Sequence, residues 1–124
     1  MATYTEPKYL SDVLLVEVAR GWTKQNGVLA ATEAALAIGT VLSKDANGIL
    51  QPIDFAATDG TENAVGVLAT HADINTGQQK TVYIARGATV AKNELVFPED
   101  ATEQNITDAL AQLEALGIVA QDTY

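Results

Sequence analysis

The strongest constraint on the fold comes from residues 59–72, DGTENAVGVLATHA, where an apolar run directly follows a cluster of turn residues. A short apolar run with β-branched residues, bounded by Asp, Gly and Thr, is typical of a buried strand that leaves a loop. We therefore predict a strand at residues 64–69. Gly66 lies inside this run, where a glycine usually marks a bend or the close approach of another backbone. We expect another strand or loop to cross closely at this position.

A hairpin is predicted before this strand. Residues 41–44 and 49–53 are largely apolar and flank the sequence Asp-Ala-Asn-Gly at residues 45–48. An Asn-Gly pair between two apolar runs is the strongest short hairpin signal, since both residues tolerate positive φ. Pro52 cannot donate a ladder hydrogen bond, so the second strand lies at a sheet edge or near its own end.

Further extended segments follow. Residues 80–85 alternate with a period of two, which predicts a strand with two different faces. Val82 and Ile84 lie on one face, and the other face holds Thr81, Tyr83 and Ala85. Short apolar pieces at residues 90–97 and 118–120 add to the extended structure.

The first third of the chain carries mixed signals. In residues 11–20 a polar start fits a helix cap, but the valines favour a strand, which is the structure that we predict. Residues 22–26 are predicted to form a loop, and Trp22 in it belongs either to the core or to a subunit contact. Residues 27–40 are rich in alanine and bracketed by glycines. This pattern fits a helix, or two strands joined by a tight turn.

The C-terminal part contains the clearest helix signal. Asp100 and Glu103 have the spacing of a capping box, although Thr102 also fits the N-cap position. One apolar stripe follows at i, i+4 and i+7, made of Ile106, Leu110 and Leu113. Gly117 is well placed to end the helix as its C′ residue. The expected fold class is mainly β (small α+β), a compact β-rich subunit with one C-terminal helix at about residues 102–116.

Composition limits the possible partners. The 124 residues fit one domain with a modest core. The net charge is −9, and nucleic-acid affinity depends largely on Lys and Arg, so no direct nucleic-acid binding is expected. No apolar run approaches the roughly 18–20 residues of a membrane span, and the N-terminus does not have the pattern of a signal peptide. Cysteine is absent, which excludes disulfides and thiol chemistry.

The residues needed for catalysis or metal binding are sparse. The two serines, Ser11 and Ser43, are not in a nucleophile-elbow sequence, and His71 is the single histidine. One histidine without cysteine cannot supply a zinc site. The chain has no phosphate-binding glycine-rich motif. We therefore predict no catalytic, cofactor or metal site, and we expect that the protein is not an enzyme.

Residues 1–10 are predicted to be a flexible N-terminal arm, and residues 11–124 a single β-rich domain. The arm is short, polar and interrupted by Pro7, so it cannot bury a core. Its residues Thr3, Tyr4 and Thr5 are good strand formers. Such an arm either adds a strand to the sheet edge of another chain or is an ordinary frayed terminus.

A series of short motifs runs through residues 39–120, beginning with Gly-Thr-Val-Leu at residues 39–42. The others are Thr58-Asp-Gly-Thr61, the strand at residues 64–69, Ala72-Asp73, Thr81-Val-Tyr83, Gly87, Glu94-Leu-Val-Phe-Pro98 and Leu116-Gly-Ile118. In order and spacing this series resembles the lambda-type head decoration proteins of tailed bacteriophages. The chain departs from the lambda protein in an insert-like region at residues 13–36, and in Phe97, where that protein has tryptophan before the proline.

The resemblance implies a structural virion protein without cofactors. Such proteins form homotrimers at the three-fold and quasi-three-fold sites of the expanded head. They lie on the outer surface of the capsid, where they bind the major capsid protein and stabilise the shell against internal DNA pressure. In this family a flexible N-terminal arm becomes ordered on the shell. The resemblance therefore assigns capsid binding to the arm residues Thr3, Tyr4, Thr5, Glu6 and Pro7.

Two other functions remain open at this point. A small-ligand or carbohydrate-binding β module would use Trp22, Tyr83 and Phe97 as a stacking platform. Aromatic residues make up only 6% of the chain and are not clustered in sequence, which favours ordinary core packing. An enzyme that uses the scattered carboxylates is the third possibility, and no motif supports it.

Overall fold

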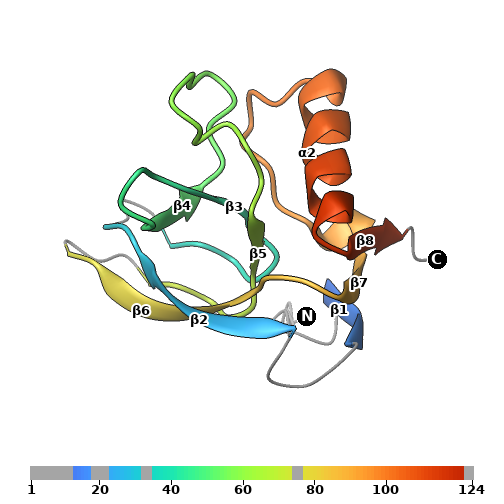
Figure 1. The fold of residues 1–124 in the computed structure, drawn as a ribbon, viewed down its shortest axis with the longest axis horizontal. Coiled ribbons are helices and arrows are strands. Elements are labelled where there is room, and N and C mark those ends of the chain that lie inside the picture. Colours follow the sequence, from blue (N-terminus) through green and yellow to red (C-terminus); the bar gives the residue numbers. More distant parts are fainter. Residues whose placement is uncertain (1–12, 18–22, 32–34, 74–76, 122–124) are drawn as a thin grey trace, which may run out of the picture.

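The computed structural model describes residues 13–17, 23–31, 35–73 and 77–121. Its strands are β1 (Leu14–Glu17), β2 (Lys24–Leu29), β3 (Val41–Lys44), β4 (Leu50–Pro52), β5 (Gly66–Leu68), β6 (Gln79–Ile84), β7 (Ala88–Ala91) and β8 (Ile118–Gln121). The 3-10 helix η1 (Lys92–Glu94) follows β7, and helix α2 (Glu103–Ala115) precedes β8. This β-rich fold with a C-terminal helix confirms the expected fold class (Figure 1). The predicted arm and Trp22 lie outside the described residues.

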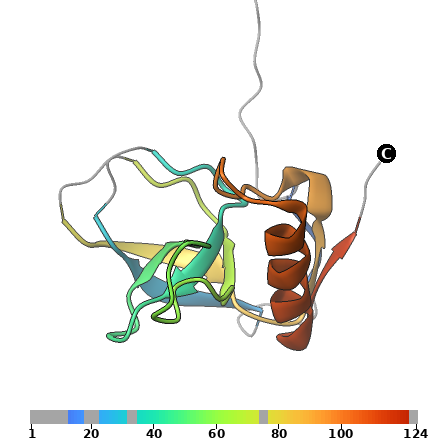
Figure 2. The same ribbon diagram turned by 90° about the horizontal axis from the view of Figure 1, so that it is seen from above.

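The strands form two units. Strands β2, β4, β3, β5 and β6 close into a barrel in that order, and β1, β7 and β8 form a three-stranded sheet with β7 in the centre. Strand β6 passes almost directly into β7, so one continuous stretch links the barrel to the sheet. Helix α2 stands beside the barrel, on the side where β7 and β8 lie (Figures 1 and 2).

Two apolar clusters fill these units. The barrel core contains Leu29, Leu42, Leu50, Leu68, Ala72, Tyr83 and Ala85. The helix-side core lies among the barrel wall, α2 and the three-stranded sheet, and its largest members are Val13, Ile38, Val41, Ile53, Val67, Ile84, Val90, Leu113 and Ile118. Strand β6 contributes alternate residues to the two cores, with Tyr83 in the first and Ile84 in the second. This confirms the alternation predicted from the sequence.

Gly66 is a position of close approach, as predicted. A Cβ atom there would lie 2.6 Å from the carbonyl oxygen of Ile84 and 2.6 Å from Cδ2 of Tyr83. Gly27 has the same relationship to this ring, because its Cβ would lie 3.1 Å from Cε1 of Tyr83. The two glycines belong to β2 and β5, the strands on either side of β6. They leave the space that the buried Tyr83 ring fills.

The predicted hairpin is present. Leu42 pairs with Pro52 and Lys44 with Leu50 in antiparallel register. Its turn is five residues long, and only Gly48 has positive φ, at +80°, while Asn47 does not. The Asp45 carboxylate accepts hydrogen bonds from the backbone N–H groups of Asn47 and Ile49, at 2.8 and 3.0 Å. The aspartate therefore fixes the turn, which is longer than the two-residue turn that Asn-Gly favours.

In the first half one prediction was wrong, and of the two alternatives for another segment the helical one is not observed where that segment is described. The loop predicted at residues 22–26 overlaps strand β2, which begins at Lys24 and pairs with β6 through six residue pairs. The alanine-rich residues 27–40 do not form a helix where they are described. Beyond β2 they contribute two isolated bridges, from Leu36 to Ala72 and from Thr40 to Val96. In both places the pairing with distant strands overrides the local propensity.

Helix α2 confirms the predicted helix with a different cap. The Thr102 side chain accepts a hydrogen bond from the Asn105 backbone N–H at 3.1 Å, and Asn105 Oδ1 accepts one from the Thr102 N–H at 3.0 Å. The capping box therefore joins Thr102 and Asn105, and the box predicted from Asp100 was wrong. Gly117 adopts φ +82° after the helix, as expected of a C′ residue. None of the helices in the described ranges is long and apolar enough to cross a membrane.

Candidate functional site

The structure does not assemble a nucleophile and base from the described candidates. Ser43 is fully buried in β3, and its hydroxyl oxygen has no hydrogen-bond partner. His71 is exposed, and its Nδ1 accepts a hydrogen bond from the Ile38 N–H at 3.3 Å. A base must lie within hydrogen-bond reach of its nucleophile, and here the serine makes no such contact. Ser11 lies outside the described residues.

The carboxylates of the described ranges do not gather into a metal site, since no group of three or more His, Asp or Glu side chains lies together there. Asp59 has a local role instead. Its Oδ1 accepts hydrogen bonds from the Thr61 hydroxyl at 2.6 Å and from the Thr61 N–H at 3.1 Å. These bonds, above all that from the hydroxyl, lower the pKa of the Asp59 carboxyl because they favour its charged form. The pair holds the loop that leads to β5.

The aromatic platform of a ligand-binding module is not formed. Tyr83 is only 2% exposed and belongs to the barrel core. Phe97 packs against the helix-side core and stacks on Phe55 with ring centroids 6.5 Å apart. The two aromatic residues therefore serve separate cores and cannot bind one face of a ligand together. Trp22, the third member of that hypothesis, lies outside the described residues.

The arm residues Thr3, Tyr4, Thr5, Glu6 and Pro7 also lie outside the described residues. Strand β1, the first described strand of the chain, pairs with β7, and the described strands leave its other edge uncovered. The pairing shifts between Leu14 and Val16, which marks a bulge. Leu15 and Val16 are 40% and 54% exposed. Strand β1 thus presents an apolar edge, and open edges of this kind can accept a further strand.

The opposite edge of the same sheet is β8, which pairs with β7 in parallel. Val16 lies opposite Thr89, and Thr89 lies opposite Val119, so the three side chains form one row across the sheet. Val119 is 47% exposed. None of the three side chains is ionised.

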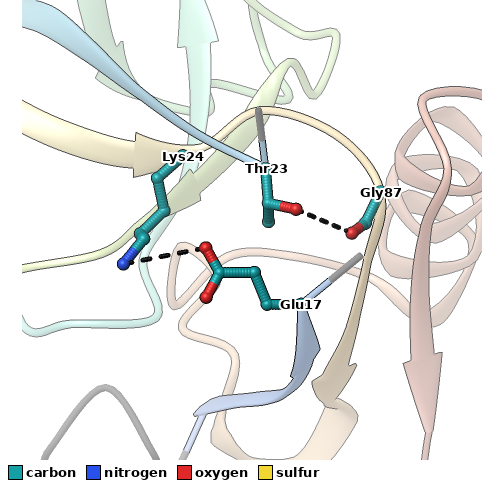
Figure 3. A network of polar contacts seen from close by, with 4 residues as sticks. All are labelled: Glu17, Thr23, Lys24 and Gly87. Carbon is teal, nitrogen blue, oxygen red and sulfur yellow. Dashed lines mark hydrogen bonds and ion pairs between the residues drawn. The ribbon is translucent and has the colours of Figure 1, made fainter. Parts of the chain in front are cut away.

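A small polar junction ties this sheet to the barrel (Figure 3). The Thr23 hydroxyl donates a hydrogen bond to the Gly87 carbonyl at 3.0 Å, and Thr23 is fully buried. Beside it, Lys24 Nζ lies 3.8 Å from Glu17 Oε1, so that β2 is linked to β1. Glu17 Oε1 is buried and accepts no hydrogen bond. The ion pair with Lys24 therefore offsets only part of the free-energy cost of removing this oxygen from water. The junction joins residues 64 apart in sequence, and no local pattern predicts it.

A second junction lies at the same end of β7, one residue further along the chain. The Ala88 N–H donates to the Gly117 carbonyl at 3.0 Å, directly after helix α2. The sheet is therefore held by the barrel and by the helix at once.

Comparison with known proteins identifies a family for this chain. A family model described as Bacteriophage lambda head decoration protein D matches residues 3–118. A search of curated proteins finds no match. The family match covers nearly the whole chain, including most of the predicted arm. The protein therefore belongs to the family of the bacteriophage lambda head decoration protein D, which gives it a structural role at a phage capsid.

Proposed function

We propose that the protein is a homotrimeric cement of the phage head. It binds the major capsid protein on the outer surface of the expanded shell, at three-fold and quasi-three-fold sites, and stabilises the shell against internal DNA pressure. Residues 1–10 are its capsid-binding arm and residues 11–124 its folded domain. The observation that carries this proposal is the family match, which includes residues 3–10 of the arm together with the domain.

The features of β1 support a role of the arm in strand addition. The arm precedes β1, an edge strand whose described outer side is apolar and uncovered. Thr3, Tyr4 and Thr5 are residues that favour extended structure. Strand addition provides main-chain hydrogen bonds without requiring a deep pocket. This agrees with the burial of Tyr83 and with the absence of a catalytic arrangement among the described candidates.

Energetics explain why trimerisation belongs to the mechanism. Ordering about eight arm residues costs on the order of 1–2 kcal/mol per residue in backbone entropy. Each new hydrogen bond contributes a net of only about 1 kcal/mol, so a single arm binds weakly. Three arms on one trimer bind together, and the effective concentration raises the avidity by about 10²–10⁴.

The test uses purified shells of a phage that encodes this protein, in the expanded and the unexpanded form. Light scattering should give the mass of a trimer for the free protein. Co-sedimentation should show binding to expanded shells and none to unexpanded ones, and bound protein should raise the temperature at which expanded shells rupture. A monomer that does not sediment with either shell would refute the proposal.

A further inference from the structure

The barrel has an open seam along strand β2. This strand pairs with β6 over all six of its residues, but it pairs with β4 at one residue only, Leu29 opposite Leu50. From Lys24 to Val28 the side of β2 that faces away from β6 therefore has no partner strand among the described strands. In Figure 1, β2 and β6 run together along the lower side of the barrel, whereas β4 meets β2 only at one end. Open edges of this kind are templates for pairing with another chain.

The hydrogen-bond pattern of the β2–β6 pair shows which backbone groups face the open side. The Ala85 N–H donates to the Thr23 carbonyl at 2.8 Å, and in an antiparallel pair such bonded positions alternate with unbonded ones. Gln25 and Gly27 therefore exchange hydrogen bonds with β6. The residue between them, Asn26, directs its N–H and C=O groups away from β6, to the open side.

Lys24 and Val28 share this direction with Asn26. The next residue in the same row, Ala30, shows where the row faces, because its N–H donates to the Leu50 carbonyl of β4 at 2.8 Å. Within the described residues the structure records no hydrogen bond to the outward backbone groups of Lys24, Asn26 and Val28. Each of the three therefore offers one N–H donor and one C=O acceptor to an added strand.

A groove lies beside this edge and is called the β2 groove below. It has a volume of about 630 Å³ and is lined by Asn26, Gly27, Val28, Thr70, Lys80, Thr81 and Val82. Val28 pairs with Lys80, and Asn26 pairs with Val82, so these four side chains lie on one face of the β2–β6 pair. Val28 is 36% exposed. In strand addition, main-chain hydrogen bonds provide affinity and recesses for alternate side chains provide specificity. The β2 edge and the β2 groove together supply both.

Lys80 determines the charge of the β2 groove. It is exposed, it is the only charged residue in the lining, and it has no ion pair with another described residue. A side chain of an added strand that lies opposite Val28 would stand in one row with Val28 and Lys80. A carboxylate in this row would meet a cation without a partner, although the chain as a whole has net charge −9. The site therefore favours an extended segment that carries an apolar and an acidic side chain on one face.

We propose that the open edge of β2 accepts an extended segment of the major capsid protein as an added strand. The inference rests on the proposed function and gives the folded domain a shell contact of its own, besides the arm. The segment presents an apolar side chain to Val28 and a carboxylate to Lys80. The same edge of another copy is not a suitable occupant. Pairing of two β2 edges is an isologous contact, which produces dimers and leaves one chain of a trimer unpaired.

Hydrogen exchange of single amides tests this contact on the unmodified full chain, free and bound to expanded shells. In the free trimer the Asn26 and Val28 amides should exchange fast and the Gln25 and Gly27 amides slowly, because only the second pair is bonded to β6. On the shell, exchange at Asn26 and Val28 should slow at least about tenfold. Fast exchange at Asn26 on the shell overturns the contact. Slow exchange at Asn26 already in the free trimer also overturns it, because the edge is then filled by the chain itself.

A proline variant tests the same contact by shell binding. Asn26→Pro removes the N–H on the open side, and edge strands tolerate proline where the missing N–H faces away from the ladder. Asn26→Ala removes the same side chain and keeps the N–H. Sedimentation with expanded shells should show binding at least about tenfold weaker for Asn26→Pro, because three copies each lose the contact, and a smaller loss for Asn26→Ala. Circular dichroism and light scattering check that both variants are folded and trimeric.

The outcomes separate this contact from the proposed function. A folded, trimeric Asn26→Pro variant that binds like Asn26→Ala overturns the contact and leaves the proposed function intact. An original chain that does not bind expanded shells overturns the proposed function itself. If Asn26→Pro does not fold, hydrogen exchange on the unmodified chain decides the outcome.

Lys80→Glu tests the acidic character of the added segment. Lys92→Glu is the matched control, since it makes the same change of charge at an exposed residue outside the β2 groove. The Lys80 variant should bind expanded shells about fivefold more weakly or worse, because an attraction becomes a repulsion in all three copies. The Lys92 variant should bind like the original chain. Equal binding of the two variants overturns the assignment of a carboxylate to the segment.

Discussion

A Cβ atom at Gly66 would lie 2.6 Å from Cδ2 of Tyr83, so strand β5 fits into the barrel only with a glycine at position 66. The second clash is with the Ile84 carbonyl, also at 2.6 Å, which belongs to backbone and cannot rotate away. Tyr83 in turn is 2% exposed and fills the space next to this glycine. The missing side chain at Gly66 and the large ring of Tyr83 therefore fill one space together.

Gly66→Ala should therefore lower the free energy of unfolding by about 1–3 kcal/mol, the usual cost of overpacking a core. Gly77→Ala is the matched control, since nothing lies within 4 Å of an added Cβ there, and its effect should stay within about 0.5 kcal/mol. Gly27→Ala should fall between them, because its closest neighbour is the movable end of Leu50 at 2.7 Å. Urea unfolding measures all three. Equal stability of the Gly66 and Gly77 variants would contradict the packing argument.

The cap of α2 gives a prediction that separates two candidate residues. Thr102→Ala removes the side chain that accepts from the Asn105 N–H, and it should cost about 1 kcal/mol of stability. Asp100→Ala should change stability by less than about 0.5 kcal/mol, because the Asp100 side chain does not form the box. Thermal unfolding at matched pH compares the two variants. A larger loss of stability in the Asp100 variant than in the Thr102 variant would instead support Asp100 as the N-cap residue, as the sequence pattern indicated.

The fold was predicted best where the signal is local. The hairpin around Gly48, the alternation of β6 and the extent of α2 each depend on neighbouring residues, and each is present. Strand β2 was missed because Lys24, Gln25 and Asn26 carry no apolar pattern. Six residue pairs with β6 hold them in a strand instead.

The candidate surfaces were harder to predict than the fold. The Thr23–Gly87 junction joins segments that are 64 residues apart in sequence, and hydrophobic periodicity and propensity carry no information about such contacts. The predicted arm lies outside the described residues, so its role stays a proposal based on composition and on the family resemblance. Strand addition would need a partner chain, and the sequence of the arm alone does not give a bound geometry.

The loop around Asp59 should show a defined pH response. Its hydrogen bonds from Thr61 lower the pKa of the carboxyl below the ordinary value of 3.8. A lowered pKa in the folded state means that this contribution to stability is complete above the ordinary value and is lost as the pH falls through the lowered one. NMR titration of the Asp59 carboxyl measures the pKa directly. Thr61→Val removes the hydroxyl donor and should move the pKa back towards 3.8, whereas Thr58→Val should leave it unchanged.

The last prediction concerns the arm and rests on the proposed function. Deleting residues 1–10 should leave the trimer intact and weaken its binding to expanded shells by about 10²-fold or more, because the avidity of three arms is lost together. Tyr4→Pro removes one backbone N–H donor from the proposed added strand and should weaken binding less than the deletion does. Tyr4→Phe is its control and keeps the backbone donor.

Mixed trimers refine this test, since full-length and truncated chains combine into trimers with three, two, one or no arms. Sedimentation with shells should show affinity that rises steeply with the number of arms, because each further arm binds at the high effective concentration set by the others. Independent arms would give affinity proportional to their number. If the truncated trimer binds as tightly as the full chain, the capsid contact lies on the folded domain, and the uncharged row of Val16, Thr89 and Val119 becomes the surface to mutate next.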